Sequence, residues 1–260
     1  MSRATHRKEG ESRWAEVAGC RIRVRVWEEA PPRSEPPVVL VHGLSMSGRY
    51  LVPTAEHLAA DFRVYAPDLP GFGQSASPNR VLDVSELADA LGAWMTSWRL
   101  SGAILVGNSL GCQIITALAM QQPHLVHAAV LVGPTPDPAG RSLPRLLARA
   151  AVDMLREERA LLPIIVRDYL RAGVWRTWRT LQHLVADRPE DRLPLLDIPV
   201  LVVWGERDAI VPAAWAGWVA QRLPNGRLLV VPEAAHAVNF GAPEPVAAGV
   251  RALAEEAPNV

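Results

Sequence analysis

A series of short, nearly continuous apolar segments limits the fold of this chain more than any other feature. They occupy residues 38–41, 63–66, 103–106, 128–132, 200–204 and 227–231. Strands that are buried on both faces have this pattern, as in parallel sheets covered by helices. Helix-like stretches accompany them at residues 85–97, 113–121, 213–222 and 245–256. The alternation predicts an α/β fold with a doubly wound, mostly parallel sheet.

The N-terminal part has a different pattern. Residues 21–26 alternate arginine with branched apolar residues, which predicts a half-solvated strand. A turn at Ala18-Gly19 would pair it with a strand near residues 14–17. The first twelve residues are polar, and we expect them to lack regular structure.

The gap between residues 132 and 200 is too long for a single crossover connection. Apolar residues recur in it at helical spacing, first at Leu143, Leu146, Leu147, Ala150, Met154 and Leu155, and again at Trp175, Trp178, Leu181, Leu184 and Val185. We therefore predict a core of residues 1–133 and 197–260 and a lid of two to four helices at 134–196. Such an insertion would cover the carboxyl ends of the strands, where ligands bind in open α/β sheets.

One serine stands between two glycines at the joint of a strand and a helix, in Gly107-Asn108-Ser109-Leu110-Gly111. This matches G-x-S-x-G, a sharp, strained turn that lifts the serine hydroxyl above the sheet. Side chains two residues before and after the serine would collide with the strand or the helix, so glycine is required. The pattern predicts that Ser109 is a nucleophile.

A serine hydroxyl needs a base, and in this architecture the acid and then the histidine follow the serine along the chain. Of the seven histidines, His236 alone follows the last apolar segment. The acid should follow the strand at 200–204, which leaves Glu206 and Asp208. We prefer Asp208, which lies deeper in its loop, and keep Asp137 as a further candidate.

Two backbone N–H groups should stabilise the oxyanion of an acyl-transfer reaction. The N–H of Leu110, at the start of the helix after Ser109, is one candidate. The loop after residues 38–41 offers the other at Leu44, beside Gly43, which permits close backbone approach. His42 precedes Ser109 in the chain, so we expect it to brace this loop rather than act as the base.

These motifs resemble the α/β-hydrolase superfamily over nearly the whole chain. The resemblance rests on His42-Gly43, the Asp68 to Ser75 loop, Gly107 to Gly111, Gly205 to Pro212 and Ala235-His236. It implies Ser109 as nucleophile, Asp208 as acid, His236 as base, and Leu44 and Leu110 as the oxyanion hole. It also implies that the Asp68 to Ser75 loop is structural and that the insertion is the family's variable lid.

The insertion offers candidate substrate contacts as well. Trp175 and Trp178 share one predicted helix face, and they either dock the lid on the core or line an apolar substrate pocket. We keep both as candidate substrate-binding residues.

The composition and the motifs that are missing from the sequence limit the possible binding partners, cofactors and cellular compartment. The chain has 27 basic and 27 acidic residues, which gives no electrostatic reason to expect nucleic acid. No apolar run approaches the about 18 residues that span a membrane. Two cysteines and no apolar leader favour a cytoplasmic protein. Metal-ligand spacing is absent and Gly71 to Ala76 lacks the context of a dinucleotide site, so we expect no cofactor and no metal. The sequence leaves a homodimer open.

The residues favour a serine hydrolase that cleaves a carboxylic ester, lactone or thioester of a small-molecule substrate through an acyl-enzyme on Ser109. One alternative is hydrolysis of a carbon–carbon bond in ring-cleavage diketones, because Asn108 before the nucleophile resembles those enzymes. Against it, Ala237 follows His236 where those enzymes carry tryptophan. Another alternative is a non-catalytic receptor for small molecules with the same fold.

Overall fold

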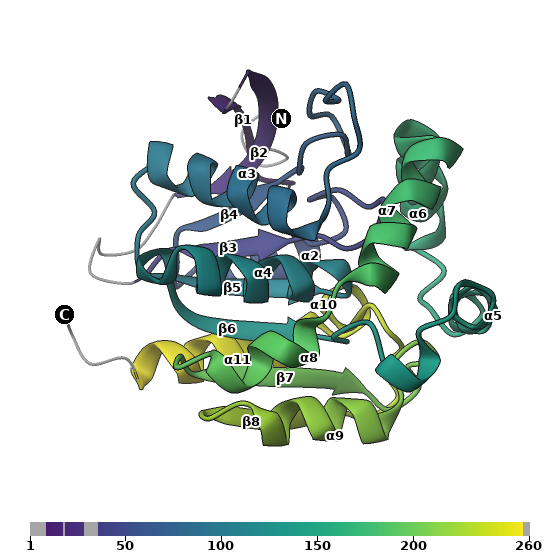
Figure 1. Cartoon of the computed structure of the whole chain (residues 1–260). Coiled ribbons are helices and arrows are strands. Elements are labelled where there is room, and N and C mark those ends of the chain that lie inside the picture. The colour runs from purple at the N-terminus through teal and green to yellow at the C-terminus, as the bar shows by residue number, and fades with distance from the viewer. Residues whose placement is uncertain (1–8, 18, 29–35, 257–260) are drawn as a thin grey trace.

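The computed structural model describes residues 9–17, 19–28 and 36–256. Eight strands form one sheet in the order β1-β2-β4-β3-β5-β6-β7-β8 (Figure 1). The strands are β1 (Glu11–Val17), β2 (Cys20–Trp27), β3 (Val38–Val41), β4 (Val64–Pro67), β5 (Ala103–Asn108), β6 (Val126–Val132), β7 (Val200–Gly205) and β8 (Gly226–Val231). Every strand expected from the sequence is present.

The six strands from β4 to β8 in the sheet order are parallel to one another. β2 pairs antiparallel with both of its neighbours, β1 and β4. β1 and β2 form the predicted hairpin, although Ala18 of its turn lies outside the described residues. β1 begins at Glu11, so the expectation that the first twelve residues lack regular structure is wrong for its last two. Pairing with Val26 and Arg25 across the hairpin fixes them as strand.

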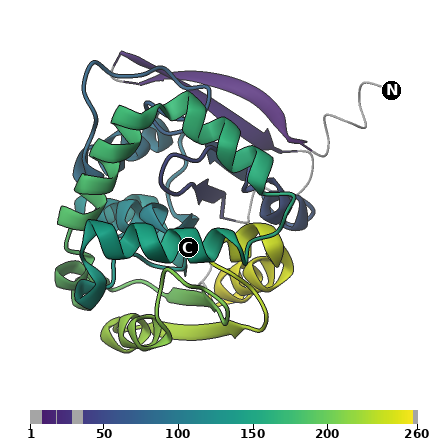
Figure 2. The same ribbon diagram turned by 90° about the vertical axis from the view of Figure 1, so that its right-hand side faces the viewer.

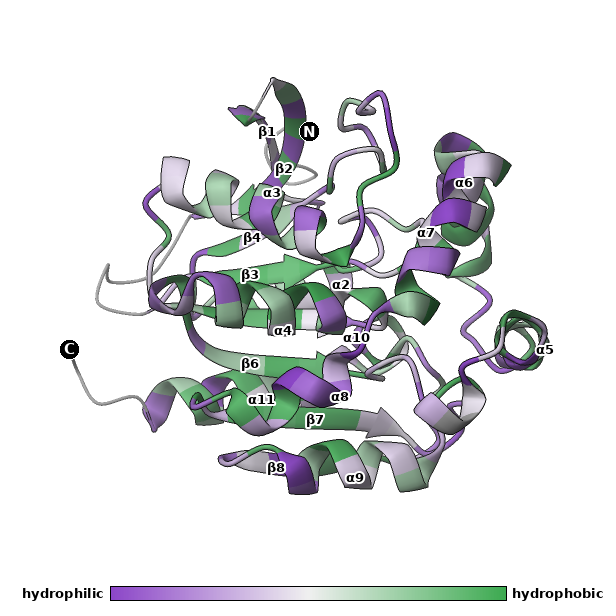
Figure 3. Cartoon of the chain, viewed as in Figure 1, coloured by the Kyte–Doolittle hydropathy of each residue, from purple (hydrophilic) through white to green (hydrophobic). Residues whose placement is uncertain are grey.

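Helices cover both faces of the sheet. One face packs against α3 (Val84–Ser97), α4 (Leu110–Gln121) and α9 (Ala213–Arg222). The other packs against α2 (Val52–Leu58), α10 (Val238–Gly241) and α11 (Pro243–Glu255). The apolar colour along β3, β6 and β7 in Figure 3 shows why both faces must be covered. This arrangement confirms the predicted doubly wound α/β fold.

Three helices of the core differ from the sequence-based expectation, and one of them is the short α10, which was not predicted. α4 begins at Leu110 instead of residue 113, because the turn at Ser109 leads directly into the helix. α2 was not predicted. It is a short helix with no side-chain cap, so its sequence carries few helix signals beyond the proline in its first turn.

The segment between β6 and β7 forms a set of helices. It contains α5 (Leu143–Met154), α6 (Leu162–Ala172), α7 (Val174–Ala186) and α8 (Pro189–Arg192), with short 3-10 turns at Pro138–Gly140 and Leu193–Leu195. Of these helices, α8 lies beside α4 and the others lie beyond the ends of the strands (Figure 1). α5, α6 and α7 lie on the side to which the parallel strands point (Figure 1), and Figure 2 looks onto this side. We call residues 134–196 the helical insertion. Within the described ranges, no helix combines the length and apolar character that a membrane crossing requires.

Candidate active site

Ser109 occupies a strained turn between β5 and α4. Its φ is +56° and its ψ is −116°, a backbone conformation that residues other than glycine rarely adopt. A Cβ on Gly107 would lie 2.7 Å from the backbone carbon of Gly111, and a Cβ on Gly111 would lie 2.4 Å from the carbonyl oxygen of Val41. Both flanking glycines are therefore required by packing, as predicted from the motif.

The strand next to β5 holds this turn in place. The N–H of Ser109 donates to the carbonyl of Val132, the last residue of β6, over 3.0 Å. The Ser109 hydroxyl lies 3.4 Å from the hydroxyl of Thr135, which follows β6. Thr135 is fixed in turn, because its carbonyl accepts a hydrogen bond from Nε2 of Gln113 on α4 (2.8 Å). The serine hydroxyl thus lies at the carboxyl edge of the sheet.

His236 and Asp208 meet at the same edge. Nδ1 of His236 lies 2.8 Å from Oδ2 of Asp208, and both side chains are buried. The other oxygen of Asp208 accepts the N–H groups of Ile210 and Val211, each over 2.8 Å. These bonds fix the carboxylate and present one oxygen to the imidazole. Nε2 of His236 is left to exchange a proton with a substrate or nucleophile.

The alternative acids lie elsewhere. Glu206 is exposed and accepts the N–H of Glu233. Asp137 lies 3.3 Å from the guanidinium of Arg149. Among the three carboxylates considered from the sequence, the structure therefore joins Asp208 to His236.

Opposing effects set the basicity of His236. Burial of the imidazole lowers its pKa, but the charge and hydrogen bond of Asp208, with the charges of Asp153 and Glu157, outweigh burial and raise the pKa to about 9. The site therefore favours the imidazolium form.

Two neighbours of Ser109 contact the loop that carries His236. Nδ2 of Asn108 donates to the carbonyl of His236 over 3.1 Å. A Cβ on Gly133, the residue after Val132, would lie 2.8 Å from Cε1 and Nδ1 of His236. Within the described part of the chain, the hydroxyl of Ser109 makes its hydrogen bond to Thr135 and not to His236. In ligand-free enzymes such contacts often tighten only when substrate binds.

The proposed oxyanion donors flank Ser109. Leu110 is the first residue of α4, so its N–H is among the donors that have no acceptor within the helix. The Leu44 loop lies against Ser109, since a Cβ on Gly43 would lie 3.4 Å from the Ser109 Cβ. The insertion supports this loop, because the hydroxyls of Ser45 and Thr177 are hydrogen-bonded over 2.8 Å.

Tyr50 is a buried site residue that sequence reasoning missed. Its hydroxyl accepts the N–H of Gly43 over 2.8 Å and donates to Oδ1 of Asn108 over 2.9 Å. Asn108 in turn holds the carbonyl of His236. One phenol therefore links the Leu44 loop, the turn at Ser109 and the His236 loop. Nothing near Tyr50 in the sequence indicates this role.

His42 braces its loop, as expected. Nε2 accepts the N–H of Leu69 over 2.9 Å, so Nδ1 carries the proton and donates to the carbonyl of Gly43 (2.9 Å). Burial lowers the pKa of His42, which keeps the ring neutral. Asp68 likewise fixes backbone by accepting the N–H groups of Gly48 and Gln74.

Trp175 and Trp178 lie on α7, the helix that carries Thr177. Trp175 is 71% exposed and Trp178 is 40% exposed. The core-facing side of α7 is formed by Thr180, Leu181 and Leu184, which are buried. Trp175 therefore does not dock the insertion on the core, and a role of either tryptophan in substrate binding stays a prediction.

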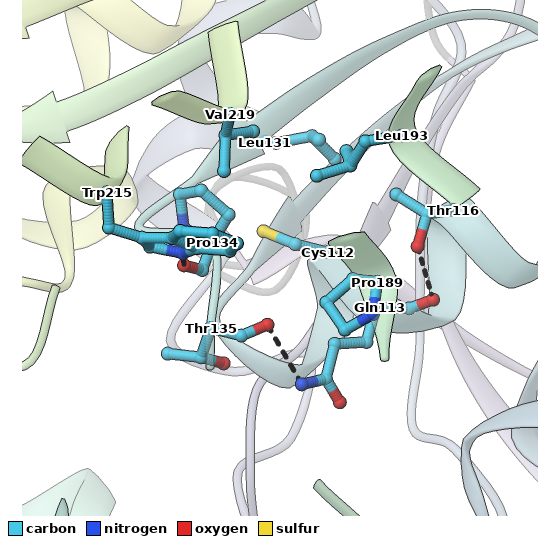
Figure 4. Close-up of a pocket in the computed structure, with 10 residues that line it drawn as sticks. All are labelled: Cys112, Gln113, Thr116, Leu131, Pro134, Thr135, Pro189, Leu193, Trp215 and Val219. Carbon is cyan, nitrogen blue, oxygen red and sulfur yellow. Dashed lines mark hydrogen bonds between the residues drawn. The ribbon is translucent and has the colours of Figure 1, made fainter. Parts of the chain in front are cut away.

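A small cavity lies next to Thr135 and Cys112 (Figure 4). It measures about 10 Å³, and Cys112, Gln113, Pro134, Leu193 and Trp215 are among its lining residues. A space of this size suits at most a single water molecule. It is therefore too small to be the substrate pocket. Across the described ranges, no three His, Cys, Asp or Glu side chains gather as a metal ion would require.

A serine on a strand-to-helix turn, an Asp–His pair from two later loops and a helical insertion over the strand ends define one class of α/β protein. Its members present these groups at the carboxyl edge of a mostly parallel sheet. The chain belongs to this class, the alpha/beta hydrolase family, whose model matches residues 38–249.

Several known proteins are similar to the chain. It is 32% identical to the dihydrolipoyllysine-residue acetyltransferase component of an acetoin cleaving system from Pseudomonas putida, over 89% of the chain but 66% of that relative. It is 30% identical to the pimeloyl-[acyl-carrier protein] methyl ester esterase of Chromobacterium violaceum, over 85% of the chain and 93% of the relative. The chain thus spans slightly less than two thirds of the first relative. A solved structure described as a putative lipase from Acinetobacter baumannii AYE superposes with a TM-score of 0.82 at 20% identity, covering 96% of this chain and 93% of that one.

Proposed function

We propose that this protein is a serine hydrolase that cleaves a carboxylic ester, or a related lactone or thioester, of a small-molecule substrate. The observation that carries the proposal is the 2.8 Å contact between His236 and Asp208, beside a serine on a strained turn. The methyl ester esterase named among the relatives acts on an ester, which supports the same bond type here.

The reaction follows from these groups. The Ser109 hydroxyl attacks the carbonyl carbon while Nε2 of His236 takes its proton, and Asp208 stabilises the resulting imidazolium. The N–H groups of Leu44 and Leu110 bind the oxyanion. His236 then gives the proton to the leaving oxygen or sulfur, and the acyl group stays on Ser109. Water, deprotonated by His236, attacks the acyl-enzyme and releases the acid.

We also propose that the helical insertion acts as a lid over the active site. Trp175 and Trp178 are the side chains that we propose to contact the acyl or leaving group. The free thiols of Cys20 and Cys112 fit a reducing, cytoplasmic compartment. No nucleic acid or membrane partner is proposed.

Nothing in the site favours carbon–carbon bond hydrolysis. The notable feature for that reaction was Asn108, and its side chain is engaged in structural hydrogen bonds to Tyr50, Val132 and His236. A receptor without turnover shares the fold, so turnover is the property to measure.

The test is steady-state hydrolysis of short p-nitrophenyl esters, γ-lactones and a dienoic ring-fission product. Ser109→Ala should lose ester turnover by at least about 10³-fold while keeping its melting temperature. Ser101→Ala, an exposed serine, is the matched control. Equal ester turnover in Ser109→Ala and the parent protein would refute the proposal. Stoichiometric labelling by a fluorophosphonate without turnover would instead indicate a receptor.

A further inference from the structure

Two carboxylates of the helical insertion hold the loops that carry the acid and the base. Oδ1 of Asp153 accepts the N–H of Ala209 over 3.0 Å. Oε1 of Glu157 accepts the N–H of Ala237 over 2.7 Å. Ala209 and Ala237 are the residues directly after Asp208 and His236. The insertion therefore holds both triad loops by their backbones, at equivalent positions.

The local structure around Asp153 is unusual for a helix of an insertion. Asp153 is the buried residue of α5, with its side chain 3% exposed. By contrast, the apolar Leu147, Val152 and Met154 of the same helix are exposed. Asp153 also lies in the last turn of α5, where the helix dipole disfavours a negative charge. Neither packing nor helix stability accounts for an acidic residue at this position. Its hydrogen bond from the N–H of Ala209 does account for it.

The two carboxylates also act on each other. Burial raises the pKa of Glu157 to about 7, the N–H of Ala237 lowers it, and the neighbouring charge of Asp153 raises it again. Near neutral pH, Glu157 therefore exchanges a proton, and in the protonated form it can donate to Asp153.

We propose that Asp153 and Glu157 are positioning residues, which fix the Asp208 and His236 loops from the insertion and stabilise the His236 imidazolium by their charge. This inference rests on the proposed function, because the imidazolium forms when Ser109 gives up its proton. The carboxylates touch neither the nucleophile nor the reacting atoms.

The charges that face His236 come from two directions. Asp208 contacts Nδ1 from the loop after β7, and Asp153 and Glu157 act from the insertion. Removing the charge of Glu157 or Asp153 leaves the contact with Asp208 intact. The expected effect is thus a lower pKa of His236, with the imidazole still oriented.

Isosteric variants separate charge from hydrogen bonding. Glu157→Gln and Asp153→Asn keep an oxygen that accepts the backbone N–H, whereas Glu157→Ala removes it. Glu158→Gln is the matched control, because Glu158 is the adjacent acid and is exposed. Because the amide variants change little volume, they keep the test open if Glu157→Ala fails to fold.

Two readouts are measured on the full chain: the pH profile of kcat/KM for a p-nitrophenyl ester, and the NMR titration of the His236 ring, assigned with His236→Gln. In Glu157→Gln and Asp153→Asn we expect both midpoints to move down by about half a pH unit or more. Glu157→Ala should in addition lose about 10-fold in kcat, a larger loss than Glu157→Gln shows, with KM nearly constant.

Midpoints in Glu157→Gln and Asp153→Asn that match those of Glu158→Gln would overturn the inference. Equal kcat losses in Glu157→Ala and Glu157→Gln would likewise exclude positioning through Ala237. The NMR titration requires no turnover, so it distinguishes this inference from the proposed function. A shifted His236 midpoint in a protein without esterase activity would support the charge coupling and refute the hydrolase assignment.

Discussion

The hydroxyl of Tyr50 donates a 2.9 Å hydrogen bond to Oδ1 of Asn108, the residue before Ser109. The hydroxyl oxygen of Tyr50 also accepts the N–H of Gly43 over 2.8 Å. The buried phenol thus joins the proposed oxyanion loop to the turn at Ser109. Burial raises the pKa of Tyr50 well above its ordinary value, so the phenol stays protonated and remains a donor.

Tyr50→Phe should impair both activity and stability. The substitution leaves the N–H of Gly43 and Oδ1 of Asn108 without this partner, and each buried unpaired group costs about 1–3 kcal/mol. We expect kcat for a p-nitrophenyl ester to fall about 10-fold or more, because the Leu44 loop loses its anchor. Tyr65→Phe is the control, since its hydroxyl bonds Glu28, away from the site. Similar kcat values in the two variants would show that the link does not position the oxyanion loop.

Asp208→Asn should preserve the fold and remove most activity. The asparagine oxygen can still accept the N–H groups of Ile210 and Val211, but an amide N–H facing Nδ1 would favour the tautomer with the proton on Nε2. That imidazole cannot accept the proton of Ser109. We expect kcat to fall about 10³–10⁴-fold, as measured by ester hydrolysis at constant pH. Glu206→Gln should stay near the parent rate, and a comparable loss in that variant would contradict the assignment of the acid.

The sequence predicted the features that depend on local physics. The strained turn at Ser109 follows from its two glycines, and the buried strands follow from their apolar composition. The choice of His236 and Asp208 followed from chain order and from the resemblance to a family. These signals lie within a few residues of the groups that they describe.

The supporting residues could not be predicted, because their partners are far away in the chain. Tyr50 is 58 residues from Asn108, Asp153 is 56 residues from Ala209, and Glu157 is 80 residues from Ala237. A tyrosine or a helical acid has many ordinary roles, and only the packed fold shows which backbone group it meets. The proposed contacts of Trp175 and Trp178 depend in the same way on how the insertion packs.

Gly111→Ala should destabilise the protein strongly. The new Cβ would lie 2.4 Å from the carbonyl oxygen of Val41, which is backbone and cannot rotate away. We expect a loss of at least about 2 kcal/mol in the free energy of unfolding, measured by urea denaturation. Gly217→Ala on α9 is the control, because a Cβ there meets nothing within 4 Å. It should gain up to about 1 kcal/mol, and a loss in Gly217→Ala equal to that in Gly111→Ala would contradict the packing argument.

The pH dependence of catalysis should report the raised pKa of His236. The free enzyme needs a neutral imidazole, and with a pKa of about 9 the neutral fraction grows about tenfold per pH unit below that value. We therefore expect kcat/KM to rise with pH from 6, with a midpoint near 9, and to level off above it. A pH profile with its midpoint at the ordinary histidine pKa of about 6.5 would show that Asp208, Asp153 and Glu157 do not raise the pKa of His236.

Stability should depend on pH in the opposite direction. The folded state binds a proton at His236 more tightly than the unfolded chain does, because the pKa is raised from 6.5 to about 9. This contribution is fully present below pH 6.5 and is lost as the pH rises through 9. The free energy of unfolding of the parent protein should therefore fall relative to that of His236→Gln between these values. Urea denaturation of both proteins at pH 6, 7.5 and 9 measures the difference, and a constant difference across this range would exclude a raised pKa.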